Sequence, residues 1–165
     1  METFTAEFRR LHEKDDDIQR IEETLGKLTG WLAPSMDGRA LSPVSKLPAK
    51  LFDLEQVGLR RVMELAEASV REMNRGNVIV SYVLLRAALE TSCLMLDASR
   101  LAIKTVKKNE VAALNDVDKF LMDVLVGFKS KEWGFSEEYI ARNVLTIIQR
   151  LSKELEIDLL WVAGL

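Results

Sequence analysis

The sequence predicts an all-α fold, namely a four- to five-helix bundle with a long N-terminal amphipathic helix. Apolar residues recur at intervals of three and four over most of the chain, which is the period of an α-helix. No run of alternating apolar and polar residues is long enough to suggest a strand. The 165 residues, of which 48% are hydrophobic and 30% charged, suffice for one domain with its own core. We therefore expect one domain overall.

Residues 1–32 are predicted to form the N-terminal helix, and residues 33–50 a loop rich in Pro, Ser and Gly. The helix is either continuous or interrupted at the acidic run of residues 15–17. All three prolines lie in the following loop, at positions 34, 43 and 48. The apolar residues at helical spacing in the first segment are Phe4, Phe8, Leu11, Ile18, Ile21, Leu25, Leu28 and Leu32.

Residues 51–165 are predicted to form the core of the helical bundle. Helical spacing resumes at Leu51 and stops at Arg75-Gly76-Asn77, where Gly76 suits a left-handed helix cap and Asn77 suits the start of the next helix. So short a joint favours antiparallel packing of the two helices that it connects. Three segments complete the prediction: an apolar helix over residues 78–106, a helix over 111–128 with Val117 and Leu121 inside, and a helix over 136–156.

The final helix carries its own apolar stripe, and an apolar tail follows it. The stripe comprises Ile140, Val144, Ile147, Ile148, Leu151 and Leu155. Residues 157–165 are expected either to pack on the bundle or to dock on a second copy. A further alternative is that the natural chain continues past Leu165.

The apolar helix over residues 78–106 carries one line of polar side chains. These are spaced three and four apart and therefore share one helix face: Arg86, Glu90, Cys93, Asp97, Arg100 and Lys104. We expect neighbouring helices to wrap the rest of this helix. Arg86 and Glu90 are expected to hold helices in register, with Asp97 and Arg100 nearer the surface. Candidate facing groups on the last long helix are Arg142, Asn143, Gln149 and Arg150.

Charge and cysteine content limit the location and the partners. The net charge of −3 gives no general positive field for nucleic acid. A single cysteine excludes an intramolecular disulfide and fits a reducing compartment, so we expect a cytoplasmic protein. Residues 78–96 have the length of a membrane span, but Arg86 and Glu90 near the centre would be costly in lipid. A buried helix of a soluble protein is therefore the preferred interpretation.

The sequence contains no motif that predicts a metal site or a cofactor site. Zinc and iron sites need several Cys or His ligands at close spacing, and this chain has only His12 and Cys93. The sequence contains no glycine-rich phosphate loop and no Gly-x-Ser-x-Gly nucleophile turn. Cys93 has no nearby histidine in the sequence to act as its base, so we interpret it as a small buried side chain. No catalytic residue is assigned.

The segment RGNVIVSYVLLRAALE, residues 75–90, resembles the central helix of an uncharacterised group of prokaryotic all-helical proteins similar to the HEPN bundles. The resemblance covers residues 50–156 and depends mainly on Arg86 and Glu90. It implies an all-helical bundle and, as one alternative, a ribonuclease or a component of a defence or toxin system. HEPN ribonucleases also carry a histidine a few residues after an arginine, whereas this chain has none after His12. On that alternative, the chain is a shortened form that lacks the catalytic histidine.

Taken together, the sequence favours a non-enzymatic helical module for binding or assembly over an enzyme. We expect a homodimer that forms through the first helix or the apolar C-terminus, with another protein as the alternative partner. A nucleic-acid adaptor is a further class, which would depend on four cations: Arg100, Lys104, Lys107 and Lys108. No aromatic residues lie between these cations to stack on bases, so the sequence supports this class only weakly.

Overall fold

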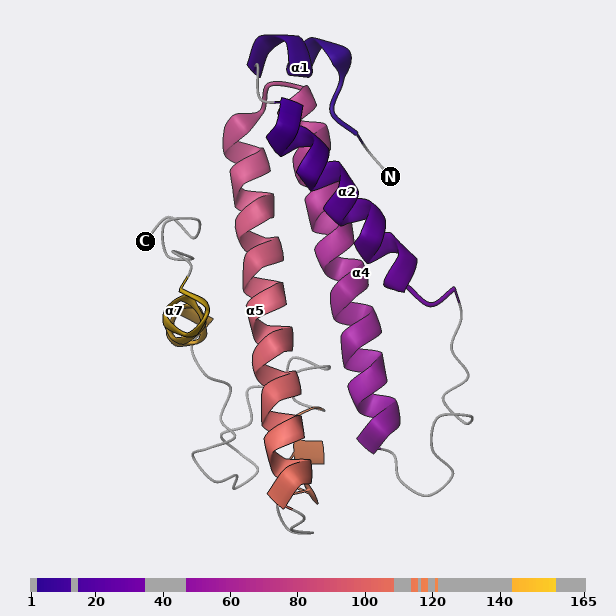
Figure 1. The fold of residues 1–165 in the computed structure, drawn as a ribbon, viewed down its shortest axis with the longest axis vertical. Coiled ribbons are helices and arrows are strands. Elements are labelled where there is room, and N and C mark those ends of the chain that lie inside the picture. Colours follow the sequence, from indigo (N-terminus) through magenta and orange to yellow (C-terminus); the bar gives the residue numbers. More distant parts are fainter. Residues whose placement is uncertain are drawn as a thin grey trace. The chain divides into compact units, whose positions relative to one another are not determined.

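The protein is all-α, as the sequence predicts, and its described part contains five helices (Figure 1). A computed structural model describes residues 3–12, 15–34, 47–108, 114–115, 117–118, 121 and 144–156. The helices are α1 (Ala6–His12), α2 (Asp15–Trp31), α4 (Leu47–Asn74), α5 (Val78–Lys108) and α7 (Val144–Leu155).

The chain divides into two compact units. Unit 1 comprises Met1–Pro34 and Gly58–Ser92, and unit 2 comprises Ser35–Val57 and Cys93–Leu165. The two longest helices, α4 and α5, therefore each contribute one part to each unit. The interactions that follow are given for each unit by itself.

The N-terminal segment is interrupted beside the acidic run, which was one of the two predicted alternatives. Helix α1 ends at His12, and α2 begins at Asp15, so the acidic run forms the first turn of α2. Carboxylates are favourable there because the N-terminus of a helix carries partial positive charge. Thr5 caps α1, since its Oγ1 accepts a hydrogen bond from the Phe8 N–H at 3.2 Å.

The core of unit 1 forms between α2 and the C-terminal part of α4. Its buried residues are Leu25, Met63 and Val70, with Phe4, Leu28, Leu32 and Ala66 packed against them. Glu22 fastens the N-terminal segment to α2, because its carboxylate accepts from the Phe4 N–H at 3.1 Å and from Arg9 Nη2 at 2.5 Å. Most of the predicted apolar stripe thus packs within the chain, although Leu11 and Ile21 are exposed.

The joint between α4 and α5 is a Schellman cap, as the glycine at position 76 suggests. Gly76 has a φ of 77°, in the left-handed region. The Asn77 N–H donates to the Glu72 carbonyl at 2.9 Å and the Gly76 N–H to the Met73 carbonyl at 3.0 Å, which are the two hydrogen bonds that define this motif. Asn77 also starts α5, because its carbonyl accepts from the Ser81 N–H.

The carboxylate of Glu72 fastens the same joint from the side. Its two oxygens accept from Asn77 Nδ2 at 2.6 Å and from Arg75 Nη1 at 2.7 Å. The hydrogen bond from Asn77 is the main cause that holds the pKa of Glu72 below its ordinary value. Desolvation opposes it, and the hydrogen bond and charge of Arg75, with the charge of Arg71, lower the pKa further. The turn therefore favours the ionised form of this side chain over the protonated form.

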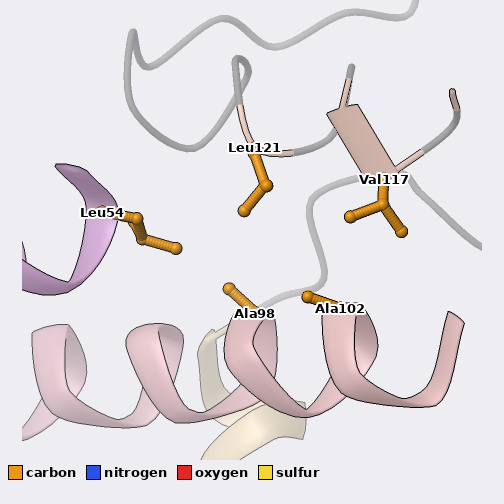
Figure 2. Close-up of a cluster of buried hydrophobic side chains, with 5 residues drawn as sticks. All are labelled: Leu54, Ala98, Ala102, Val117 and Leu121. Atoms are coloured by element: carbon orange, nitrogen blue, oxygen red, sulfur yellow. The ribbon is translucent and has the colours of Figure 1, made fainter. Parts of the chain in front are cut away.

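The core of unit 2 gathers small residues of α5 against larger ones from other segments. Ala98 and Ala102 face Val117 and Leu121, and Leu54 enters from α4 (Figure 2). The buried positions of Val117 and Leu121 confirm their predicted inward orientation, while the rest of the predicted helix over residues 111–128 lies outside the described residues. In α7, Ile147, Ile148 and Leu151 are buried as predicted, but Leu155 is exposed. Ile140 and the tail 157–165 lie outside the described residues.

Two predictions about the long helices need correction. Helix α4 begins at Leu47, so the last four residues of the predicted loop are helical. Pro48 is compatible with this because the first turn of a helix needs no N–H donor from it. The prediction that neighbouring helices wrap α5 is wrong for its first turns, where five of the first six residues are exposed: Val78, Ile79, Val80, Tyr82 and Val83.

Replacement of Gly76 by alanine tests the cap. No atom lies within 4 Å of the added Cβ, so the whole effect comes from the left-handed backbone. We expect Gly76→Ala to lower the free energy of unfolding by about 1–2 kcal/mol, measured by urea denaturation. The control is Gly26→Ala inside α2, also with nothing within 4 Å, which should raise stability by about 0.5–1 kcal/mol. Equal effects of the two substitutions would contradict the assignment.

The pH dependence of stability tests Glu72. Because its pKa is lowered by folding, the carboxylate stabilises the protein above its ordinary pKa, and this contribution disappears as the pH falls through the lowered pKa. Glu72→Gln should therefore lower the urea midpoint at pH 7 and have less effect at pH 3. A Glu72→Gln difference that is the same at both pH values would show that the ionised form has no special role.

Candidate functional site

The polar line of α5 separates into two pairs with different surroundings. The first pair, Arg86 and Glu90, lies within α5 in unit 1, with Arg86 Nε donating to Glu90 Oε1 at 3.0 Å. Their side chains are 39% and 35% exposed. An exposed pair one helical turn apart contributes only a few tenths of a kcal/mol, roughly 0.3–0.5. Among the described residues, no group of another helix joins this pair.

The second part of the line joins α5 to α7 in unit 2. Arg150 Nη2 donates to Asp97 Oδ1, and Arg100 Nη1 donates to Glu154 Oε2. The Asp97 side chain is only 11% exposed, less than that of any other carboxylate in the described ion pairs. A buried carboxylate depends on its partner for charge compensation, so this is the pair that holds two helices together.

The predicted order of burial is therefore wrong. Asp97, expected nearer the surface, is buried, whereas Arg86 and Glu90, expected to hold helices in register, are half exposed. The reason is that Arg150 of α7 pairs with Asp97, whereas Arg86 and Glu90 pair with each other on their own helix. Arg150, one of the four predicted facing groups, indeed pairs with the line, Gln149 is exposed, and Arg142 and Asn143 lie outside the described residues.

Arg150 stands between two carboxylates. Besides its bond to Asp97, its Nε lies 3.7 Å from Glu154 Oε1, which is too far for a hydrogen bond. Within the described part of the chain, this buried Nε has no hydrogen-bond partner. The four charges of Asp97, Arg100, Arg150 and Glu154 thus form one neutral network that joins α5 and α7.

The remaining residues of the line, and the lysines that follow it, differ in burial. Cys93 is buried, as predicted for a small core side chain. Of the four cations proposed for nucleic acid, Arg100 is paired with Glu154, Lys104 and Lys107 are exposed, and the side chain of Lys108 lies outside the description. No group of three or more potential metal ligands occurs among the described residues.

Sequence reasoning missed a pocket in unit 1. It has a volume of about 340 Å³ and lies among α2, α4 and the first turns of α5. Its apolar walls are formed mainly by Phe4, Ile21, Leu25, Val70, Met73 and Leu85. Polar lining groups come from Arg20, Thr24, Ser69 and Ser81. The individual residues look like ordinary helix positions in the sequence, and only their convergence from four segments forms the pocket.

Two serines form the buried polar contact beside this pocket. Ser69 Oγ on α4 donates to the Ser81 carbonyl on α5 at 3.0 Å, and the two hydroxyl oxygens lie 2.8 Å apart. Both residues are buried. Since the Ser69 hydroxyl has one proton and the carbonyl takes it, the Ser81 hydroxyl donates to Ser69.

Comparison with family models, curated proteins and solved structures found no match to this chain. The resemblance to HEPN bundles stays a prediction, as does the ribonuclease alternative. One stretch of the described residues, Val78–Lys107, is long and apolar enough to cross a membrane. Core helices of soluble proteins pass the same criterion.

Three matched substitutions rank the ion pairs. Methionine keeps most of the aliphatic stem of arginine but removes the charge. We expect Arg150→Met, which strands the buried Asp97 carboxylate, to lower the free energy of unfolding by about 1.5–3 kcal/mol. Arg100→Met should cost at most about 1 kcal/mol and Arg86→Met about 0.5 kcal/mol or less, because those pairs are solvated. Urea denaturation measures all three, and a loss for Arg86→Met as large as that for Arg150→Met would contradict the ranking.

Proposed function

We propose that the protein is a non-enzymatic helical assembly module that forms a homodimer through the apolar surface of α5, defined as Val78, Ile79, Val80, Tyr82 and Val83. The observation that carries the proposal is the exposure of all five side chains, which reaches 80% at Ile79. Contiguous apolar surfaces of this kind mark interaction sites on soluble proteins. A partner that covers the surface would remove it from water.

A second copy of the chain is the occupant that fits the chemistry of this surface. Residues 78–85 contain no charged side chain, so the surface offers nothing to pair with a basic or acidic partner. An uncharged apolar surface is complementary to another copy of itself, and two-fold symmetry places the same residues on both sides of the contact. Arg86 and Glu90, at its border, neutralise each other and add no net charge.

The other segments proposed for dimerisation are less suitable or fall outside the description. Ile18 and Leu25 of α2 are buried within their own unit, and the apolar side chains that this segment leaves exposed, Leu11, Ile21 and Trp31, are ten residues apart in the sequence and form no run like that of α5. The C-terminal tail, residues 157–165, lies outside the described residues. The proposed location is the cytoplasm, since the sole cysteine is buried and can form no intramolecular disulfide.

Charge placed on the apolar surface tests the dimer. Light scattering of the wild-type protein should give a mass twice the 18.7 kDa of one chain. Ile79→Glu and Val83→Glu should each weaken association by about tenfold or more, because a buried unpaired carboxylate costs more than 1.4 kcal/mol. The matched control is Ile103→Glu, which alters an exposed isoleucine of the same helix outside the surface and should leave the dimer intact.

Three outcomes would contradict the proposal. A strict monomer at high concentration would exclude self-association. Binding of the monomer to phospholipid vesicles, lost in Ile79→Glu, would assign the surface to a membrane. Cleavage of labelled RNA that is lost in Arg86→Ala without loss of folding would replace the non-enzymatic module with the ribonuclease alternative.

A further inference from the structure

The pocket of unit 1 has the dimensions and the lining of a ligand site. Its volume of about 340 Å³ falls within the range of about 300–1,000 Å³ for small-molecule pockets. Apolar side chains from α2, α4 and α5 make up most of the lining. Water gains little in such a space because it finds few hydrogen-bonding partners.

The hydroxyl groups that line the pocket all have hydrogen-bond partners within the protein. Ser69 and Ser81 use both of their hydroxyl protons within the protein, one on the Ser81 carbonyl and one between the two hydroxyls. The Thr24 hydroxyl donates to the Arg20 carbonyl at 2.8 Å. A polar group of a ligand inside the pocket would therefore find no free hydroxyl proton to accept. An alkyl chain needs no such donor, so the pocket favours a ligand whose buried part is an alkyl chain.

Arg20 gives the pocket one charged lining group. It lies on the exposed side of α2, one turn before Thr24. Among the described residues, no carboxylate is within ion-pair distance of its guanidinium. The nearby acids of α2 with described side chains are Asp16, Asp17, Glu22 and Glu23. Glu22 accepts from Arg9 and from the Phe4 N–H, and Glu23 accepts from Gln19 at 3.0 Å. The guanidinium therefore retains donors for an anion.

The N-terminal segment holds one wall of the pocket in place. Phe4 lines the pocket, and its N–H donates to Glu22 of α2. The Thr5 N–H donates to Asn74 Oδ1 at 3.0 Å, and Asn74 Nδ2 donates to the Thr3 carbonyl at 2.9 Å. Two helices thus fix the segment on both sides of Phe4, so the wall is formed before any ligand arrives.

From these observations we infer that the pocket binds a free single-chain amphiphile with an anionic head group, such as a medium-chain carboxylate. The alkyl chain lies among the apolar side chains, and the carboxylate accepts hydrogen bonds from Arg20. A volume near the lower end of the ligand range suits one chain rather than the two chains of a phospholipid. The inference does not rest on the proposed dimer, since none of the five residues of the apolar surface of α5 lines the pocket.

Isothermal titration with decanoate and its neutral analogue decanol tests this site. We expect one decanoate per chain. Arg20→Gln should weaken decanoate binding about three- to tenfold, the equivalent of about 0.7–1.4 kcal/mol, and change decanol binding less than about twofold. The matched control Lys27→Gln removes an exposed cation of α2 that does not line the pocket, and it should leave both affinities unchanged.

Two further variants test whether the alkyl chain of the ligand occupies this pocket. Ala66→Phe places a ring inside the pocket and should abolish binding of both ligands. Because a larger core residue can also disturb folding, Ile21→Ser serves as the second variant. Ile21 is half exposed and lines the pocket, so its replacement should weaken the binding of both ligands. The far-UV circular dichroism and the melting temperature should stay close to those of the wild type.

Several results would overturn the inference. One is the absence of binding by wild-type protein to either ligand. Another is wild-type affinity in Ile21→Ser and in folded Ala66→Phe, which would place the ligand elsewhere. Equal losses of decanoate binding in Arg20→Gln and Lys27→Gln would show that Arg20 acts only through the net charge of the protein and makes no specific contact with the carboxylate. Binding to phosphatidylglycerol vesicles without binding to free decanoate would exclude a free amphiphile.

Discussion

The reversal between α4 and α5 depends on a left-handed glycine, two backbone hydrogen bonds and the carboxylate of Glu72. Because three residues join the helices, α5 returns beside the end of α4 within unit 1, which brings Ser69 next to Ser81. The pocket takes its lining from both of these helix segments. The reversal thus determines which side chains of α5 meet α4 and which remain exposed at its start.

The two units use the polar line of α5 differently. In unit 2, α7 covers it, and the buried Asp97 carboxylate requires the charge of Arg150. In unit 1, Arg86 and Glu90 remain half exposed and pair within their own helix. Burial rather than the number of ion pairs decides which of them matters for stability, because water screens the exposed pair. The strongest electrostatic constraint therefore joins α5 to α7.

Unit 1 combines two apolar features with different geometry. The apolar surface of α5 consists of exposed uncharged side chains, which suits association with a copy of itself, whereas the pocket is a cavity that has Arg20 among its lining groups. The surface and the pocket draw on different residues of α5, so a change in one leaves the other chemically intact. Self-association and ligand binding are thus separable in experiments.

The sequence by itself determined the fold class, the reversal at Gly76 and the inward positions of Val117, Leu121, Ile147, Ile148 and Leu151, because helical periodicity and glycine conformation are local properties. It also supplied Arg150 among the partners of the polar line. Only the tertiary structure decided that Asp97 is buried, that α5 begins exposed, and that Phe4 and Arg20 line one pocket with Ser69 and Ser81. Periodicity defines the faces of a helix, but which face is covered at each turn depends on neighbours distant in the sequence.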